Sequence, residues 1–492
     1  MQQSKDKSLY SAFKAKDTRF DGRFFAGISS TGIYCRPVCK AKKPKIENCN
    51  FYPTAAAAEQ AGYRPCLLCR PELAPGTAIV DASASLALRA ARLLEENCGT
   101  GQSLDEIAGR LGYTDRHLRR VFTAEYNVSP VQYLQTCRLL LAKNLLTDTN
   151  LSVLDVAMAA GFGSLRRFND LFKKQYRLSP TSLRKQAAGK ENRDSDAAAN
   201  IILALGYRPP YRWEQILRFL AQRAIPGIEV IKENEYLRTV KFFAKEKKKY
   251  LKGWIRVGNI PKKNTLKVTI SPELLPALPQ ILAKVRQLFD LHCDPETIYE
   301  VLSPMNNMHP NLCVPGTRLP GCFDPFEMAI RAVLGQQITV KAASTLAARL
   351  VNTYGSPIQT GIDGLTHIFP LPENIIDLDT PIANNLGPLG ITSARAKTIL
   401  GLSKAFVQKE INFDQSADPE IEIKKLLALP GIGNWTARYI AMRAMSWPDA
   451  FLETDAGIKK ALAPRTEKEM ISMSEAWRPW RSYATINLWN SL

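Results

Sequence analysis

Two closely spaced pairs of cysteines near the N-terminus constrain this chain more than any other feature of its sequence. Cys35 and Cys39 lie in TGIYCRPVC, and Cys66 and Cys69 lie in RPCLLCRP. This spacing lets two loops converge on one tetrahedral zinc ion with the four thiolates as ligands. The sequence therefore predicts a small zinc-binding domain with one four-thiolate Zn2+ site.

Such a site is either structural or chemically active, and the residues alone leave both possibilities open. A structural site only holds a small domain together. Four thiolates around one divalent cation leave the site with net negative charge, so a ligand sulfur stays electron-rich and can attack an alkyl electrophile. Basic residues near the cysteines would attract a phosphate backbone: Arg36, Lys40, Lys42, Lys43, Lys45, Arg64 and Arg70.

The length and charge of the chain indicate several domains and a nucleic-acid partner. A chain of 492 residues exceeds what one hydrophobic core supports, and about 150 residues per domain gives three or four units. The net charge of +20 favours a polyanionic partner over a basic surface that is merely solvated. The start, MQQSKDKSLY, lacks the apolar run of an export signal, and no long apolar stretch follows. We therefore expect a cytoplasmic protein with no membrane contact. We further predict a monomer that is located at the bacterial nucleoid.

Around the cysteines, over roughly residues 5 to 75, the sequence resembles the N-terminal domain of the Ada family, which carries both cysteine motifs. The resemblance implies that Cys35 accepts a methyl group from a DNA methylphosphotriester, while Cys39, Cys66 and Cys69 remain zinc ligands. The transfer would be stoichiometric, because a thioether is not readily dealkylated. Methylation would also remove one negative charge from the zinc centre and weaken its repulsion of DNA.

A repeated pattern between residues 103 and 180 predicts two helix-turn-helix units. SLDEIAGRLGYTDRHLRRVF and SVLDVAMAAGFGSLRRFNDLF both place apolar residues at helical spacing before a glycine turn. Twin units joined by a helix resemble the AraC family of activators, whose second helices enter DNA major grooves. We therefore expect operator DNA and RNA polymerase as partners. The following side chains are predicted to read DNA, although exposed basic residues are often only solvated: Arg116, His117, Arg119, Arg120, Arg166 and Arg167.

The C-terminal half has a different pattern. YLKGWIRVGN and TLKVTIS alternate as strands do, whereas residues 322–492 are predicted to be mainly helical. The segment LLALPGIGNWTARYIA at 426–441 is typical of a helix-hairpin-helix. Gly431 and Gly433 permit tight backbone geometry, and the amides that open the next helix can bind a DNA phosphate. The alternative is an ordinary tight turn between two helices.

Asp455 follows the hairpin in FLETDAGIKK, and this arrangement resembles the helix-hairpin-helix DNA glycosylase superfamily. Over about residues 200–490 the resemblance narrows to the AlkA type, 3-methyladenine DNA glycosylase II. It implies that Asp455 supports departure of the base, although a lone aspartate is more commonly a helix cap. Trp435 stands where bifunctional members carry a lysine, so we expect no strand nicking. The resemblance also assigns the base pocket to aromatic residues that are otherwise ordinary core residues: Trp435, Tyr439 and Trp489.

The C-terminal half departs from the AlkA pattern at two positions. Ala456 replaces a tyrosine beside the catalytic aspartate, so the range of excised bases stays open. Gln337 stands where the AlkA type inserts a leucine into the gap left by a flipped base, and glutamine fills the comparable place in endonuclease III. The motif PCHRV, the acceptor of a second methyltransferase activity in Ada proteins, is absent from the chain.

Together these patterns predict a multidomain, mainly α-helical protein with α+β parts. We expect a zinc α+β domain at 1–78, an all-α twin helix-turn-helix domain at 79–187, a linker at 188–200, an α+β sheet subdomain at 201–315 and a helical helix-hairpin-helix domain at 316–492. The predicted function joins methyl sensing, transcription activation and monofunctional base excision. The alternative is a DNA-binding regulator whose glycosylase half recognises damage without excision.

Overall fold

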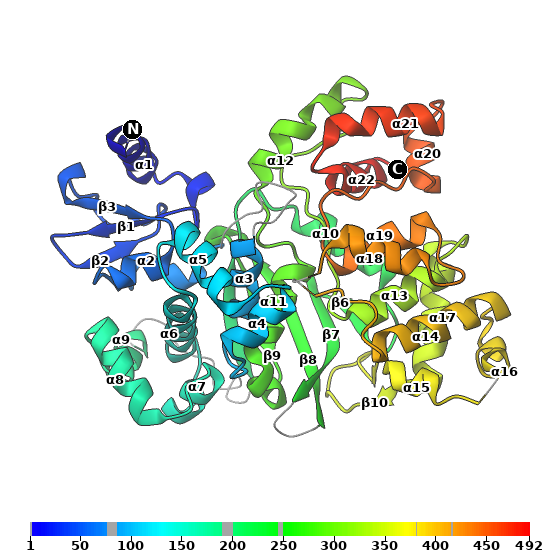
Figure 1. Cartoon of the computed structure of the whole chain (residues 1–492), viewed down its shortest axis with the longest axis horizontal. Helices are drawn as coiled ribbons and strands as arrows, with labels where there is room; N and C mark the ends of the chain where they lie inside the picture. Colours follow the sequence, from blue (N-terminus) through cyan, green and yellow to red (C-terminus); the bar gives the residue numbers. More distant parts are fainter. Residues whose placement is uncertain (1, 76–85, 189–199, 245–248, 380, 415–416) are drawn as a thin grey trace.

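The protein is multidomain and mainly helical, with small sheets, as the sequence predicts (Figure 1). The computed structural model describes residues 2–75, 86–188, 200–244, 249–379, 381–414 and 417–492. Most of the predicted linker, residues 189–199, lies outside the described residues. No helix in the described ranges is long and apolar enough to cross a lipid bilayer.

The N-terminal part packs two helices around a sheet with the strand order β3-β1-β2-β4. Strand β1 pairs antiparallel with β2 and β3, whereas β2 pairs parallel with β4. Phe24, Ala26 and Phe13 are buried beside the cysteines and form its core. The elements are α1 (Gln2–Ala15), β1 (Phe25–Ile28), β2 (Ile33–Cys35), β3 (Cys49–Tyr52), α2 (Ala55–Gln60), β4 (Arg64–Pro65) and the short 3-10 helices η1 (Thr18–Phe20), η2 (Ile46–Asn48) and η3 (Pro71–Leu73).

The next part is all helical and contains the two predicted helix-turn-helix units. Ser103 and Ser129 each begin a helix with a capping box. The serine hydroxyl accepts a hydrogen bond from the amide three residues later, and the side chain of that later residue accepts one from the serine amide. A long helix, α6, joins the units. The helices are α3 (Leu86–Glu96), α4 (Leu104–Arg110), α5 (Asp115–Tyr126), α6 (Pro130–Asp148), α7 (Val153–Ala159), α8 (Leu165–Tyr176) and α9 (Pro180–Ala188).

A five-stranded antiparallel sheet with the order β5-β9-β8-β7-β6 follows. The two segments predicted to be strands, YLKGWIRVGN and TLKVTIS, form β8 and β9 of this sheet. Its elements are β5 (Ile201–Gly206), α10 (Trp213–Arg223), β6 (Glu229–Lys232), β7 (Glu235–Ala244), β8 (Lys249–Ile260), η6 (Pro261–Lys263), β9 (Thr265–Ile270), η7 (Pro272–Ala277), α11 (Leu278–Leu288), α12 (Pro295–Leu302) and η8 (Ser303–Asn307).

The C-terminal part is a helical domain with one two-stranded ribbon. Its elements are α13 (Pro325–Leu334), α14 (Val340–Tyr354), β10 (Ser356–Pro357), β11 (His367–Ile368), α15 (Pro372–Ile376), α16 (Ile382–Leu386), η9 (Gly387–Leu389), α17 (Ser393–Val407), α18 (Pro419–Leu427), α19 (Asn434–Ala444), α20 (Ala456–Leu462), α21 (Glu467–Ser474), η10 (Glu475–Trp477) and α22 (Arg481–Asn490). Helix α10 of the preceding part packs against α14, so the site described below draws residues from both parts.

The hydrophobic cores link the parts through the helix-turn-helix part. Phe168 and Phe172 of α8 belong to the same buried cluster as Ile255 of the large sheet and the core of the helical domain. A second cluster joins Ala57 of α2 to Phe122 of α5. The helix-turn-helix part therefore packs against the zinc-binding part on one side and the large sheet on the other (Figure 1).

Candidate functional site

The four predicted zinc ligands meet at one end of the N-terminal sheet. Cys35 ends β2 and Cys66 follows β4, and the parallel pairing of Tyr34 with Pro65 places these two cysteines side by side. The ligand atoms of Cys35, Cys39, Cys66 and Cys69 all lie within 4.8 Å of one another. Tetrahedral zinc with Zn–S bonds of about 2.3 Å separates its sulfurs by about 3.8 Å, so the cluster fits one Zn2+. The four cysteines form a four-thiolate zinc site, as predicted.

Backbone amides distinguish the four sulfurs. The N–H of Arg36 donates to Sγ of Cys69, and the N–H of Leu68 donates to Sγ of Cys66, both at 3.4 Å. Within the described residues, no backbone amide hydrogen bond reaches Sγ of Cys35. Hydrogen bonds to a thiolate withdraw electron density from it, and here they act on Cys66 and Cys69.

Two arginines beside the cysteines, Arg36 and Arg70, form ion pairs within the protein, whereas we expected them to attract a phosphate backbone. Arg36 donates to both carboxylate oxygens of Asp21 and to the carbonyl of Cys69. Arg70 pairs with Glu72 at 2.9 Å and with Asp148 of α6 at 2.8 Å. These two guanidinium groups brace the zinc site against its own domain and the regulator. Exposed basic side chains remain at Lys40, Lys42 and Lys45.

Five of the six predicted DNA-reading side chains are exposed on the second helices of the two units. Thr114 and Ser164 cap α5 and α8, accepting from the amides of His117 and Arg167. His117 is half-buried because its ring stacks on Tyr113 with centroids 5.0 Å apart. The exposed members are Arg116, Arg119, Arg120, Arg166 and Arg167.

The predicted hairpin connects α18 to α19. Gly431 has a φ of +86°, and a Cβ there would lie 2.0 Å from Oγ1 of Thr398, so only glycine fits. Gly433 has an extended φ of −94° and precedes α19 as its cap. A left-handed backbone is therefore required at the first glycine alone. A Cβ at Gly433 would meet nothing within 4 Å, so the space around this second glycine is open.

Asp455 lies where α20 begins, and its carboxylate binds two tryptophans. Oδ2 accepts from Nε1 of Trp435 at 3.0 Å, and Oδ1 accepts from Nε1 of Trp489 at 2.9 Å. Oδ1 also accepts from the amide of Ile458 at 3.1 Å, which makes Asp455 the cap of α20. The aspartate is thus a helix cap and, at once, a carboxylate set among aromatic rings.

The three predicted pocket aromatics cluster around this carboxylate. Trp435 stacks on Tyr439 with centroids 5.0 Å apart and planes 12° apart, and Tyr439 meets Trp489 edge-on at 6.3 Å. A fourth ring, Phe219 of α10, stacks on Trp489 at 6.2 Å. Sequence reasoning missed Phe219, although it lies in the conspicuous segment PPYRWEQILRFLAQRA and one helical turn before Arg223.

Gln337 is exposed in the turn between α13 and α14 and has a left-handed φ of +55°. Its neighbour Gln336 is anchored to the hairpin, because Nε2 donates to the carbonyl of Gly431 at 2.9 Å and to Oγ1 of Thr436 at 3.0 Å. Gln337 therefore has a strained backbone and an exposed side chain, while Gln336 is held in place. This arrangement suits a Gln337 side chain that inserts into a DNA duplex, as the sequence predicts. Ala456 opens α20 and is exposed next to Asp455.

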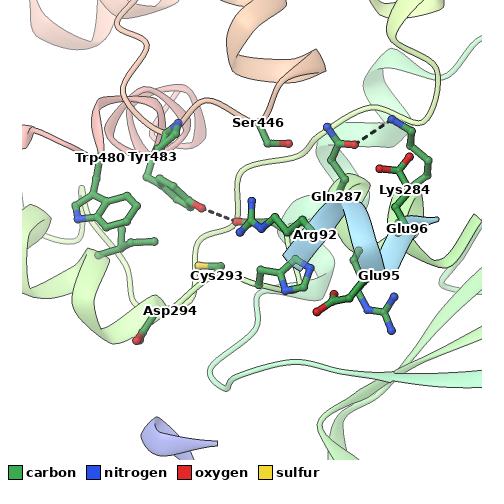
Figure 2. Close-up of a pocket in the computed structure, with 16 residues that line it drawn as sticks. Arg92, Glu95, Glu96, Lys284, Gln287, Cys293, Asp294, Ser446, Trp480 and Tyr483 are labelled. Carbon is green, nitrogen blue, oxygen red and sulfur yellow. Dashed lines mark hydrogen bonds between the residues drawn. The ribbon is translucent and has the colours of Figure 1, made fainter. Parts of the chain in front are cut away.

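A separate cavity of about 80 Å3 lies between α3 of the regulator and α11 (Figure 2). Several of its polar groups already have partners: Tyr483 donates to Asp290, Tyr133 donates to Glu95, and Asp294 pairs with Arg23. Burial, with nearby arginines, holds the pKa of its His292 well below the usual range. We therefore interpret the cavity as part of the junction between two domains and not as a base-binding pocket.

Comparisons with known protein families find a match for each of the four structural parts of the chain. Residues 8–72 match the metal binding domain of Ada, 107–186 a helix-turn-helix domain, 202–324 the AlkA N-terminal domain, and 330–480 the HhH-GPD superfamily of base excision DNA repair proteins. Among solved structures, a 3-methyladenine DNA-glycosylase from Archaeoglobus fulgidus is 18% identical, with a TM-score of 0.46; the match covers 58% of this chain and 96% of that one.

The zinc site, the twin helix-turn-helix and the helix-hairpin-helix fold define a DNA repair protein fused to a transcription regulator, and DNA is its partner. A probable bifunctional transcriptional activator/DNA repair enzyme AlkA of Mycobacterium tuberculosis is 36% identical over 98% of this chain and 96% of its own length. DNA-3-methyladenine glycosylase 2 of Escherichia coli is 34% identical over 58% of this chain and 95% of its own. The chain belongs to the AlkA family of bifunctional transcriptional activators and DNA repair enzymes.

Proposed function

We propose that the C-terminal half excises alkylated bases such as 3-methyladenine from DNA by hydrolysing the N-glycosidic bond. The observation that carries this proposal is the carboxylate of Asp455, whose two oxygens each accept an indole hydrogen bond from a ring of the aromatic cluster. A carboxylate fixed in this way is oriented before a flipped base and its sugar enter the site.

The reaction then needs little beyond Asp455 and water. The bond between C1′ and the base nitrogen breaks, and its electron pair leaves with the base. The Asp455 carboxylate stabilises the positive charge that develops on the sugar. Water forms the new bond at C1′ and gives its proton to Asp455, from which it passes to solvent.

The surrounding residues account for recognition. Trp435, Tyr439 and Trp489 stack on the flipped purine, whose ring carries positive charge after alkylation. Gln337 fills the gap that the base leaves in the duplex, and the amides after Gly431 and Gly433 hold the DNA backbone. Trp435 offers no amine for a Schiff base, so the enzyme leaves the strand uncut.

For the N-terminal part we propose that Cys35 accepts a methyl group from a DNA methylphosphotriester. A Zn2+ ion bound at the site keeps its thiolates deprotonated. The sulfur of Cys35 forms the new S–C bond, the O–C bond breaks, and its electron pair remains on the phosphate oxygen. The products are a thioether and a phosphodiester anion, so each chain reacts once.

The side chains on α5 and α8 then hold operator DNA for activation through RNA polymerase: Arg116, His117, Arg119, Arg120, Arg166 and Arg167. The proposed domain limits remain 1–78, 79–187, 201–315 and 316–492.

Release of 3-methyladenine from methylated duplex DNA tests the excision step. Asp455→Asn retains a capping side chain but removes the charge, and we expect base release to fall by about a thousandfold. Asp418→Asn is the matched control, because Asp418 caps α18 through the amides of Glu420 and Ile421 with no indole partner. Equal release by wild type and Asp455→Asn would overturn the catalytic assignment of Asp455, whereas no release by wild type would favour a regulator that only recognises damage. For the sensor, a methyl group found by mass spectrometry on a cysteine other than Cys35 would overturn that assignment.

A further inference from the structure

Two guanidinium groups line the wall of the aromatic cluster. Cζ of Arg223, at the end of α10, lies 3.7 Å from the ring centroid of Phe219 and 5.9 Å from that of Trp489. Cζ of Arg443, on α19, lies 4.8 Å from Phe219 and 5.7 Å from Tyr439. Positive charge therefore stands beside the proposed binding place of the flipped base.

No carboxylate within the described residues neutralises these two groups. Nη1 of Arg223 donates to the carbonyl of Phe219 at 3.3 Å and to the side-chain amide oxygen of Gln222 at 3.5 Å. Arg443 donates to the hydroxyl of Tyr439 at 2.9 Å and to two backbone carbonyls.

The neighbouring Arg331, in contrast, has carboxylate partners, because it pairs with Glu229 at 2.9 Å and with Glu327 at 3.0 Å.

The positive charge beside the aromatic cluster also changes the pKa of Tyr439. Burial alone would raise the pKa of its hydroxyl, but the positive charges of Arg443, Arg223 and Arg331 outweigh burial and lower it.

We propose that Arg223 is a specificity-determining residue, and that its charge favours neutral damaged bases over bases that carry a formal positive charge. This inference rests on the proposed glycosylase function. It adds neutral damaged bases to the cationic alkylated bases, such as 3-methyladenine, that the aromatic cluster receives, and it assigns to Arg223 the balance between the two classes.

The charge change during bond cleavage explains the preference. When the C1′–N bond breaks, a cationic base keeps the electron pair and leaves neutral. A neutral base leaves as an anion and later takes a proton from solvent. A guanidinium beside the base stabilises the developing anion, whereas it repels a cationic base before the bond breaks.

The ring of Phe219 supports the same preference. A cationic base is normally held by cation-π attraction to aromatic faces. At 3.7 Å, Arg223 already occupies one face of Phe219 with the protein's own cation. The ring therefore offers a cationic base less attraction than its position suggests.

Single-turnover base release by the full-length protein tests the proposal with two duplexes, one carrying hypoxanthine as the neutral base and one carrying 7-methylguanine as the cationic base. The variant Arg223→Met removes the charge and keeps much of the apolar stem. We expect its hypoxanthine release to fall about tenfold and its 7-methylguanine release to rise severalfold. Arg223→Lys should recover much of the hypoxanthine rate. Arg218→Met, an exposed position on the same helix, is the control and should match wild type on both substrates.

The two rates separate the possible outcomes. Opposite changes on the two substrates support a charge effect. An equal fall on both substrates assigns Arg223 a structural role and overturns the proposal, as does the absence of any change. Wild type that releases 7-methylguanine but not hypoxanthine overturns this inference alone. Wild type that releases no damaged base overturns the proposed glycosylase function and this inference with it.

Discussion

The indole N–H of Trp489 donates a 2.9 Å hydrogen bond to Oδ1 of Asp455, although 34 positions separate the two residues in the sequence. Trp489 lies on the last helix, α22, and Asp455 begins α20. The bond fixes the carboxylate on the side opposite to Trp435, so the aspartate has little freedom to rotate. An aspartate that only capped a helix would not need two indole donors.

Replacing Trp489 by phenylalanine should therefore slow base excision and leave DNA binding intact. Phenylalanine keeps an aromatic face but loses the donor, and a hydrogen bond to a charged group contributes about 1.5–3 kcal/mol. We expect the single-turnover rate of base release to fall by about tenfold to a hundredfold. Trp477→Phe, a buried tryptophan elsewhere in the same domain, provides the control. An unchanged rate for Trp489→Phe would mean that the indole bond does not orient the carboxylate.

Metal analysis should find about one zinc ion per chain, held by the four clustered cysteines. Cys39→Ser should lose most of the zinc, because hydroxyl oxygen is a poor replacement for a thiolate ligand. Cys49→Ser is the matched control: Cys49 lies in the same sheet, outside the cluster, and within the described part of the chain its sulfur bonds only the carbonyl of Lys45. Zinc loss from both variants would point to general unfolding and would contradict the assigned ligand set.

A buried carboxyl group makes the junction between the zinc-binding part and the regulator sensitive to pH. Burial raises the pKa of Glu59 to about 8, although hydrogen bonds from Tyr34 and Thr136, both at 3.0 Å, act in the opposite direction. The raised pKa means that the folded state holds the proton more tightly than the unfolded state. The resulting stabilisation is complete below about pH 4.5, where the unfolded chain is also protonated, and is lost as the pH rises toward 8.

Glu59→Gln mimics the protonated form and should remove this pH dependence. At pH 9 we expect the variant to resist urea better than wild type, by a free energy on the order of 3 kcal/mol. The difference should shrink as the pH falls to 5. Equilibrium unfolding across this range measures it, with Glu467→Gln at an exposed position as control. A difference that is the same at both pH values would contradict the assignment.

The sequence predicts best what short motifs encode. The cysteine pairs, the capping serines and the PGIG turn depend on residues a few positions apart, and each appears where its spacing places it. Contacts between distant segments leave no such pattern. Phe219 and Arg223 come from α10, far in sequence from Asp455, and only the packing of α10 onto the helical domain brings them to the aromatic cluster. In the same way Arg36 and Arg70 look like DNA-binding residues in sequence, but Asp21, which pairs with Arg36, and Asp148, which pairs with Arg70, lie in other segments.

The ion pair between Lys143 and Glu72 is another such contact, and it connects the zinc-binding part to α6. Nζ of Lys143 lies 2.6 Å from the Glu72 carboxylate, and the two side chains are only 1% and 3% exposed. Glu72 follows the zinc ligand Cys69 by three positions and also binds Arg70. Breaking a buried pair leaves an uncompensated charge and typically costs about 3–5 kcal/mol.

Lys143→Met should therefore lower the free energy of unfolding by about 3 kcal/mol or more, because Glu72 stays buried and, among the described residues, keeps only Arg70 as a basic partner. Adding Glu72→Gln to that variant should recover part of the loss, since the buried charge is then gone. Urea unfolding of the full chain measures both effects. Lys173→Met, exposed on α8, is the control and should change stability by less than about 0.5 kcal/mol. If the double variant proved no more stable than Lys143→Met alone, the loss would come from packing of the lysine stem and not from the unpaired carboxylate.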